Sequence, residues 1–236
     1  MALRDELWSA ISPIYEGILD HPFITGLTDG TLPKGSFRHF VVQDSHYLRS
    51  FARALSACAA RAPTAADTAM FGRHASGAVE VEQQMHAEFM GALGSSAEAA
   101  AAEPIMPTTR AYLSYLLAVA HGGSFAEGLG AVLPCYWIYA EVGKALLARS
   151  SPDPLYARWI SAYGAEEFQQ VVDEVLALTD RVGAEISSCE RARVRGHFVA
   201  TSTYEWMFWD AAWRRETWPT FKTLDSTSSS TEESDR

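Results

Sequence analysis

Residues 125–147 read FAEGLGAVLPCYWIYAEVGKALL, with apolar residues at helical rather than alternating spacing. Side chains three and four positions apart share one face of a helix, so this spacing predicts a buried helix. Ser124 directly precedes this run, and Glu127 lies three residues after Ser124, which is the pattern of a capping box. The sequence therefore predicts a helix over 125–147 that begins at Ser124.

The same spacing recurs along most of the chain and predicts further helices. We expect them over residues 3–19, 34–61, 64–89, 108–120, 155–182 and 191–218. Prolines and glycines mark residues 21–33 as a loop and 95–107 as a connection or short cap. No window shows the alternation of an amphipathic strand. The expected fold is therefore an all-α bundle of six or seven helices.

Composition limits the class of protein. The chain has 29 acidic and 19 basic residues and a net charge of -10, which disfavours nucleic acid as a partner. Its apolar runs are too short to cross a membrane, and charged residues at 4–6 replace the apolar core of a signal peptide. Its three cysteines form no C-x-x-C pair, so we expect neither a disulfide framework nor a zinc site. Cysteines without disulfides fit a reducing compartment, and we therefore expect a cytoplasmic protein.

Length and composition also predict the domain organisation. The 236 residues are many for one domain and few for two, so we expect one helical domain over 1–220. Residues 221–236 are rich in Ser, Thr, Glu and Asp. Such a segment buries too little apolar surface to fold, and we expect an acidic, disordered tail.

Cys135 is the candidate nucleophile. Pro134 lies inside the predicted helix, where proline removes a hydrogen bond, presses on the carbonyl of Gly130 and is expected to kink the helix. Tyr139 is four residues on and shares a face with Cys135. A helical cysteine is more often a small core residue, but a polar neighbourhood is what makes a thiol reactive. Cys58 and Cys189 have no comparable setting.

Glu205 is the candidate acid. It stands in the aromatic run TYEWMFWD over 203–210, within a helix expected to face the core. A carboxyl group there is either paired or has a raised pKa, because burial disfavours its charge. A structural glutamate that satisfies a backbone group is an equally good interpretation of this segment alone. A buried acid is also the group that protonates a heterocycle nitrogen.

Asp44 and Tyr47 form a third candidate cluster. They are three residues apart on one predicted helix, and a short carboxylate is disfavoured inside a helix unless it has something to bind. Solvent exposure of Asp44 is the alternative. Tyr112 and Tyr163 lie in apolar helical contexts, where a tyrosine is more often a core residue with a satisfied hydroxyl.

No metal site is expected. Helical bundles hold two irons through Glu-x-x-His pairs, and none of the seven histidines has an acidic residue three positions before it. Glu82 and His86 are four apart, but no second pair of this kind occurs. An iron-dependent oxidase or oxygenase on such a bundle is thus disfavoured.

These segments together resemble the TenA family, also known as thiaminase II. The similarity spans about residues 5 to 218. The matching stretches are HPF (21–23), VQDSHYL (42–48), LPCYWIY (133–139) and YEWMFWD (204–210). The resemblance implies a heme-oxygenase-like helical bundle without heme or other cofactor, assembled as a homotetramer. It further implies hydrolysis of 4-amino-5-aminomethyl-2-methylpyrimidine to the hydroxymethyl compound, and cleavage of thiamin.

The resemblance also implies roles for individual residues. Cys135 is similar to the nucleophile that adds to the pyrimidine ring, and Glu205 to the acid that protonates a ring nitrogen. Substrate-binding roles are implied for five other residues. Asp44 is similar to the carboxylate that binds the ring nitrogen and exocyclic amine, and Tyr47 to the residue that stacks on the ring. Tyr163 is implied to assist Glu205, and Tyr112 and Tyr139 to surround the thiol. A pyrimidine-binding or regulatory protein without turnover is the alternative of a different class.

Overall fold

The computed structural model describes residues 2–220, except for the side chains of 81–86 and 97. Within that range it contains ten helices and no strand, which confirms the predicted all-α class and corrects the predicted number of helices. The helices are α1 (Leu3–Leu19), α2 (Pro22–Asp29), α3 (Lys34–Arg61), α4 (Ala65–Ala92), α5 (Ala97–Ala102), α6 (Pro107–Gly122), α7 (Phe125–Leu147), α8 (Pro154–Gly164), α9 (Glu166–Glu185) and α10 (Ser188–Arg214).

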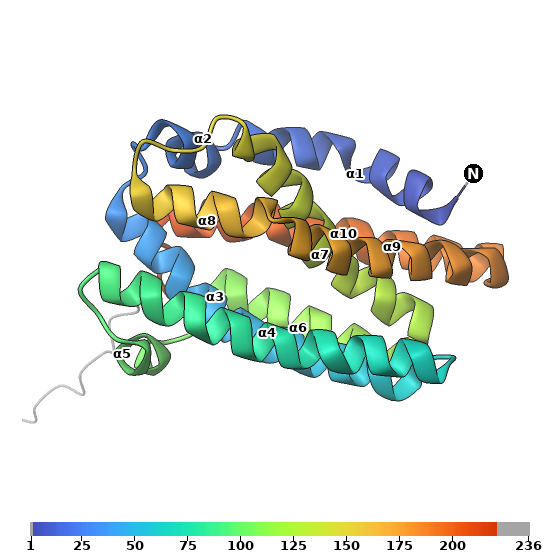
Figure 1. The fold of residues 1–236 in the computed structure, drawn as a ribbon. Coiled ribbons are helices and arrows are strands. Elements are labelled where there is room, and N and C mark those ends of the chain that lie inside the picture. Colours follow the sequence, from blue (N-terminus) through green and yellow to red (C-terminus); the bar gives the residue numbers. More distant parts are fainter. Residues whose placement is uncertain (1, 221–236) are drawn as a thin grey trace, which may run out of the picture.

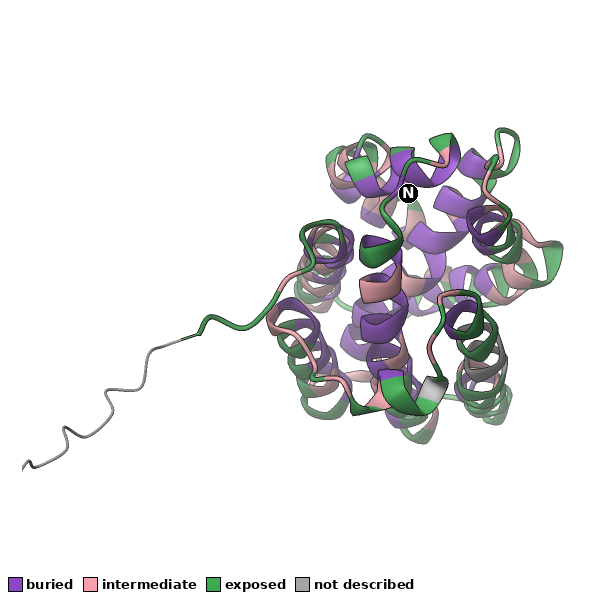
Figure 2. Ribbon diagram, turned by 90° about the vertical axis from the view of Figure 1, so that its left-hand side faces the viewer, coloured by how far each residue is buried: buried purple, intermediate pink, exposed green. Residues whose placement is uncertain are grey.

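The helices form a bundle around α7. In Figure 1, α3, α4 and α6 run side by side below, α1, α8 and α9 lie above, and α7 crosses between the two groups. α7 contacts α3, α6, α8, α9 and α10. Figure 2 shows the result, with the buried faces of the helices turned inward and the exposed faces turned to solvent. Most of α7 is buried, as its apolar composition predicts.

The start of α7 is confirmed in detail. The Ser124 hydroxyl accepts a hydrogen bond from the Glu127 N–H at 3.2 Å, and the Glu127 carboxylate accepts one from the Ser124 N–H at 2.6 Å. This reciprocal pair satisfies two N–H groups that the first helical turn leaves free. The helix then continues through Pro134 to Leu147. Cys135 and Tyr139 are thereby presented on one face of the central helix.

The loop predicted over 21–33 is wrong, because α2 occupies most of it. Pro22 is the first residue of α2, where its missing N–H costs nothing. The imidazole Nδ1 of His21 accepts a hydrogen bond from the Phe23 N–H at 3.1 Å and caps the helix. Gly30 ends it with φ of 72°, a conformation that favours glycine. The same residues that suggested a loop are the start and stop signals of a short helix.

The single helix predicted over 155–182 is also wrong. The chain leaves the helical conformation at Ala165, with ψ of 146°, so that α8 and α9 are separate. Residues 95–107 contain the short helix α5, which agrees with the predicted connection or cap. The last helix ends at Arg214 rather than near 218.

The predicted tail over 221–236 lies outside the described residues, and the single domain over 1–220 stays a prediction. Within the described part of the chain, no helix is long and apolar enough to cross a membrane.

Candidate active site

The seven predicted site residues come from five helices that meet around the middle of α7. All are buried except Cys135, which is half-buried. Their positions are Asp44 and Tyr47 on α3, Tyr112 on α6, Cys135 and Tyr139 on α7, Tyr163 on α8, and Glu205 on α10.

Four of the seven residues line one cavity of about 580 Å³, namely Asp44, Cys135, Tyr139 and Tyr163. Cavities of roughly 300–1000 Å³ are typical of small-molecule sites. The alternative of a solvent-exposed Asp44 is wrong, since this residue is 4 % exposed. A thiol and a carboxyl group thus face one enclosed space.

The other three residues form a hydrogen-bonded chain packed behind that space. The Tyr112 hydroxyl donates to Glu205 Oε1 at 2.7 Å, and the Tyr47 hydroxyl donates to the Tyr112 oxygen at 3.2 Å. A hydroxyl that contacts Glu205 is therefore that of Tyr112, which the resemblance had placed beside the thiol, and the assisting role implied for Tyr163 stays a prediction. The ring of Tyr47 stacks on Phe51, with centroids 5.6 Å apart, and Phe51 lines the cavity.

Glu205 is 1 % exposed, and its electrostatic surroundings favour the neutral acid. The pKa of Glu205 is raised to about 8, mainly by burial; the hydrogen bond from Tyr112 lowers this pKa, and the negative charge of Asp44 raises it. The aromatic run predicted either a paired carboxyl group or a raised pKa, and Glu205 has both a hydrogen-bond partner and a raised pKa. A carboxylic acid that keeps its proton at neutral pH can donate that proton to a basic ring nitrogen.

The three thiols differ in the way that the sequence predicts. Burial raises the pKa of Cys58 to about 12, so its sulfur behaves as a core group. Cys189 is exposed at the start of α10, away from the cavity, where its Sγ accepts a hydrogen bond from Arg193 at 3.3 Å. Cys135 is half-buried and lines the cavity. Negative charge on Cys135 also contributes to the raised pKa values of Tyr47, Tyr112 and Tyr139, after burial, which places these phenols within electrostatic range of the sulfur.

A close helix contact positions Tyr163. Its ring lies 5.0 Å from that of Tyr139, centroid to centroid. Gly143 makes this contact possible, because a Cβ at that position would meet the backbone carbon of Tyr163 at 2.4 Å. We expect Gly143→Ala to force α8 away from α7 and to lower the free energy of unfolding by about 1–3 kcal/mol. Urea unfolding measures this, with Gly72→Ala on the open face of α4 as the control. Equal destabilisation in both variants would contradict the contact.

Sequence reasoning missed much of the cavity wall. The apolar part of the wall includes Leu48, Phe51, Phe168 and Val171, and its polar part includes Arg73, His74, Tyr136, Glu167 and Glu174. Phe51 was detectable, since it lies one helical turn after Tyr47. The α4 and α9 residues carried no signal in the sequence, because nothing in it pairs those two helices across a cavity.

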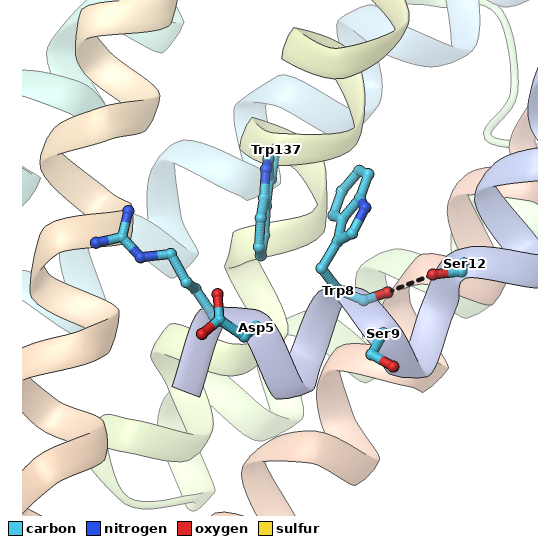
Figure 3. A pocket seen from close by; sticks show the side chains of 6 residues that line it. Asp5, Trp8, Ser9, Ser12 and Trp137 are labelled. Atoms are coloured by element: carbon cyan, nitrogen blue, oxygen red, sulfur yellow. Dashed lines mark hydrogen bonds between the residues drawn. The ribbon is translucent and has the colours of Figure 1, made fainter. Parts of the chain in front are cut away.

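A second, shallower pocket of about 400 Å³ lies between α1 and α7 (Figure 3). The indole rings of Trp8 and Trp137 form its wall, with centroids 4.6 Å apart. Its lining residues are Arg4, Asp5, Trp8, Ser9, Ser12 and Trp137. None of the seven predicted residues faces this pocket.

Among the side chains that the structure describes, no three His, Cys, Asp or Glu groups gather closely enough to hold a metal ion. The side chains of Glu82 and His86 lie outside the described set.

Comparisons with known proteins identify the class. The chain belongs to the TENA/THI-4/PQQC family, whose model matches residues 8–215. The resemblance to TenA drawn from the four sequence stretches is therefore confirmed. A relative from Bacillus subtilis (strain 168), called aminopyrimidine aminohydrolase, is 39 % identical over 218 residues, which cover 92 % of each chain.

Solved structures support the same class. A TenA homologue from P. horikoshii OT3 superposes with a TM-score of 0.84 and 30 % identity, covering 91 % of this chain and 99 % of that one. A Shewanella denitrificans domain described as having a heme oxygenase-like fold has a TM-score of 0.70 and 17 % identity, covering 89 % of this chain and 92 % of that domain. This similarity confirms the predicted heme-oxygenase-like fold and concerns the fold alone.

Proposed function

We propose that this enzyme hydrolyses 4-amino-5-aminomethyl-2-methylpyrimidine to the hydroxymethyl compound in thiamin salvage, and that it also cleaves thiamin. Family membership and the 39 % identity to an aminopyrimidine aminohydrolase support the reaction. The observation that carries the proposal is that Glu205 is buried and hydrogen-bonded to Tyr112, with a pKa raised to about 8, while Cys135 and Asp44 line one cavity. Water supplies the hydroxyl group, and ammonia leaves.

The proposed mechanism uses the two groups in turn. Direct displacement at the exocyclic methylene is slow, so the Cys135 thiolate first adds to the pyrimidine ring while Glu205 protonates a ring nitrogen. The electrons of the dearomatised ring then expel the amine, or the thiazole in the case of thiamin. Water adds to the methylene, and departure of the thiolate restores the aromatic ring.

The binding roles proposed for the other residues are those that the resemblance implies. We assign Asp44 to the ring nitrogen and exocyclic amine, because a carboxylate on the cavity wall can accept the amine proton. Phe51 supplies aromatic surface on the cavity wall, and Tyr47, to which the resemblance assigns the stacking role, stacks on Phe51. Tyr139 and Tyr163 place hydroxyls at the cavity, and Tyr112 controls the proton of Glu205.

Turnover by the purified protein tests the proposal. We expect release of ammonia and formation of the hydroxymethyl pyrimidine in equal amounts from the aminomethyl compound, followed by NMR. Binding of the pyrimidine without turnover would favour the pyrimidine-binding alternative. Dependence of turnover on iron and oxygen would favour the oxidase.

The assembly and location implied by the resemblance remain part of the proposal. We propose a homotetramer, and the exposed apolar side chains of Leu147, Trp213 and Trp218 offer surface for contacts between copies. The mass of the protein in solution tests this assembly. A cytoplasmic location stays a prediction.

A further inference from the structure

His74 is a buried histidine on the wall of the cavity, and none of the roles above uses it. Its side chain is 7 % exposed. Nδ1 lies 3.2 Å from the Tyr136 hydroxyl, and Nε2 lies 3.4 Å from a carboxylate oxygen of Glu174. The three residues come from α4, α7 and α9, and all three line the cavity that Cys135 faces.

The surroundings of His74 favour a neutral imidazole. Burial lowers the pKa of His74. The negative charge of Glu174 on α9 raises this pKa, and the positive charge of Arg73 on α4 lowers it. From α7, the neutral phenol of Tyr136 faces Nδ1. A neutral imidazole has one donor and one acceptor nitrogen. With its Nε2–H directed to Glu174, Nδ1 is left to accept a proton from Tyr136.

Tyr136 connects this histidine to the thiol. It follows Cys135 directly in α7, and both residues line the cavity. Burial raises the pKa of Tyr136 well above its usual value, and negative charge on Cys135 raises it further. The Tyr136 hydroxyl bonds to His74, and Tyr136 lines the same cavity as Cys135.

The proposed reaction needs a group that accepts the thiol proton. Cys135 lies in the middle of α7, away from the helix N-terminus that lowers the pKa of many reactive thiols. Glu205 holds its own proton at neutral pH, and the buried tyrosines hold theirs more strongly. A carboxylate is in general a much weaker base toward a thiol than an imidazole is. A neutral imidazole is the best matched acceptor.

We propose that His74, oriented by Glu174, accepts the Cys135 proton by way of the Tyr136 hydroxyl, a role that rests on the proposed function. The S–H proton moves to the Tyr136 oxygen while the Tyr136 proton moves to His74 Nδ1. The products are a thiolate, an unchanged neutral tyrosine and an imidazolium paired with Glu174. The reverse transfer returns the proton when the thiol leaves the ring at the end of the cycle. His74 is thus a positioning residue that acts through Tyr136.

The experiment measures two pH profiles in His74→Gln. The first is kcat/KM for the aminomethyl pyrimidine, and the second is the rate of Cys135 alkylation by iodoacetamide, followed by peptide mass spectrometry. We expect kcat/KM at pH 7 to fall about 10²-fold. In the parent, protonation of His74 at low pH should lower both rates, which gives each profile an acid limb. We expect this limb to be absent in His74→Gln. Glu174→Gln keeps the imidazole but weakens its orientation, and we expect a loss of about tenfold.

His46→Gln is the matched control. His46 is also buried with a lowered pKa, but its Nε2 bonds to the Glu103 carbonyl at 2.9 Å, and it does not line the cavity. We expect both acid limbs to persist in this variant. If His74→Gln fails to fold, Tyr136→Phe carries the test, with the same loss of both limbs expected.

The outcomes separate this inference from the proposed function. Unchanged pH profiles in folded His74→Gln or Tyr136→Phe, together with an inactive Cys135→Ser variant, would overturn the proton path and leave the function standing. Full activity of Cys135→Ser would overturn the proton path and the thiol mechanism but not the hydrolysis, whereas absence of turnover by the parent chain would overturn the proposed function. Loss of the acid limbs in His74→Gln and Tyr136→Phe, but not in His46→Gln, supports the path.

Discussion

Replacing Cys135 with serine is expected to lower kcat/KM for the aminomethyl pyrimidine by roughly 10⁴-fold or more, as for nucleophiles removed from other enzymes. A serine hydroxyl is similar in size but holds its proton far more strongly than a thiol, so the ring adduct does not form. The residual rate reports what Glu205 and the cavity contribute without a nucleophile. Steady-state release of ammonia measures the change.

Cys189→Ser is the matched control for this variant. Its sulfur is exposed on α10 and distant from the cavity, so we expect unchanged kinetics. Pyrimidine binding to Cys135→Ser, followed by calorimetry, should be retained, because Asp44 and the aromatic wall remain in place. Equal turnover by Cys135→Ser and the parent chain would exclude the thiol from the reaction.

The elements that could be predicted from the sequence are those whose signals are local. The capping box at Ser124 and the helical spacing after it predicted α7 over the same residues that the structure shows. The aromatic run around Glu205 predicted a buried carboxyl group that is either paired or raised in pKa, and Glu205 is 1 % exposed and accepts a hydrogen bond from Tyr112. In each case the deciding interactions lie within one or two helical turns.

The wrong predictions concern helix boundaries, because a proline or glycine can lie in a loop or can begin or end a helix. Proline and glycine in 21–33 were interpreted as loop residues, although Pro22 begins α2 and Gly30 ends it. The break at Ala165 gave no pattern of its own, because the close approach of Gly143 to the end of α8 is a tertiary contact. Local signals in the sequence predict where a chain changes direction, but tertiary packing determines whether a short helix forms there.

The site shows the same division. The resemblance supplied seven residues, five of them within the matching stretches, and the structure brings the seven together from five helices. The wall formed by His74 and Glu174 has no motif, since it exists only because α4 and α9 face each other across the cavity. The resemblance finds the residues that it assigns to the family's site, whereas cavity residues outside that set require coordinates.

Replacing Glu205 with glutamine should lower kcat/KM by roughly 10²–10³-fold, because an amide can donate a hydrogen bond but cannot transfer a proton. The parent profile should show a basic limb near pH 8. Below the pKa of about 8 the acid holds the proton that the ring nitrogen needs, and above it the proton is lost. We expect this limb to be absent in Glu205→Gln. A limb of the same position in both would assign it to another group.

The same shift predicts a difference in stability with a definite sign. An unfolded glutamate loses its proton near pH 4.3, whereas folded Glu205 keeps it to about pH 8. The folded state therefore binds the extra proton between these values, and the stability contributed by Glu205 falls as pH rises through this window. Glu205→Gln lacks this loss. Urea unfolding measures the free energy of unfolding of the variant and of the parent at pH 5 and at pH 8. The difference between them should change in favour of the variant from pH 5 to pH 8, by on the order of a few kcal/mol.

Tyr112→Phe separates the hydrogen bond from the acid itself. The Tyr112 hydroxyl stabilises the Glu205 carboxylate and so holds its pKa down. Its removal should move the basic limb of kcat/KM to higher pH while the acid remains. Tyr47→Phe removes a hydroxyl that reaches Glu205 only through Tyr112, and its shift should be smaller. A shift to lower pH in Tyr112→Phe would mean that the hydroxyl stabilises the protonated acid, and the proton on Glu205 would then need another explanation.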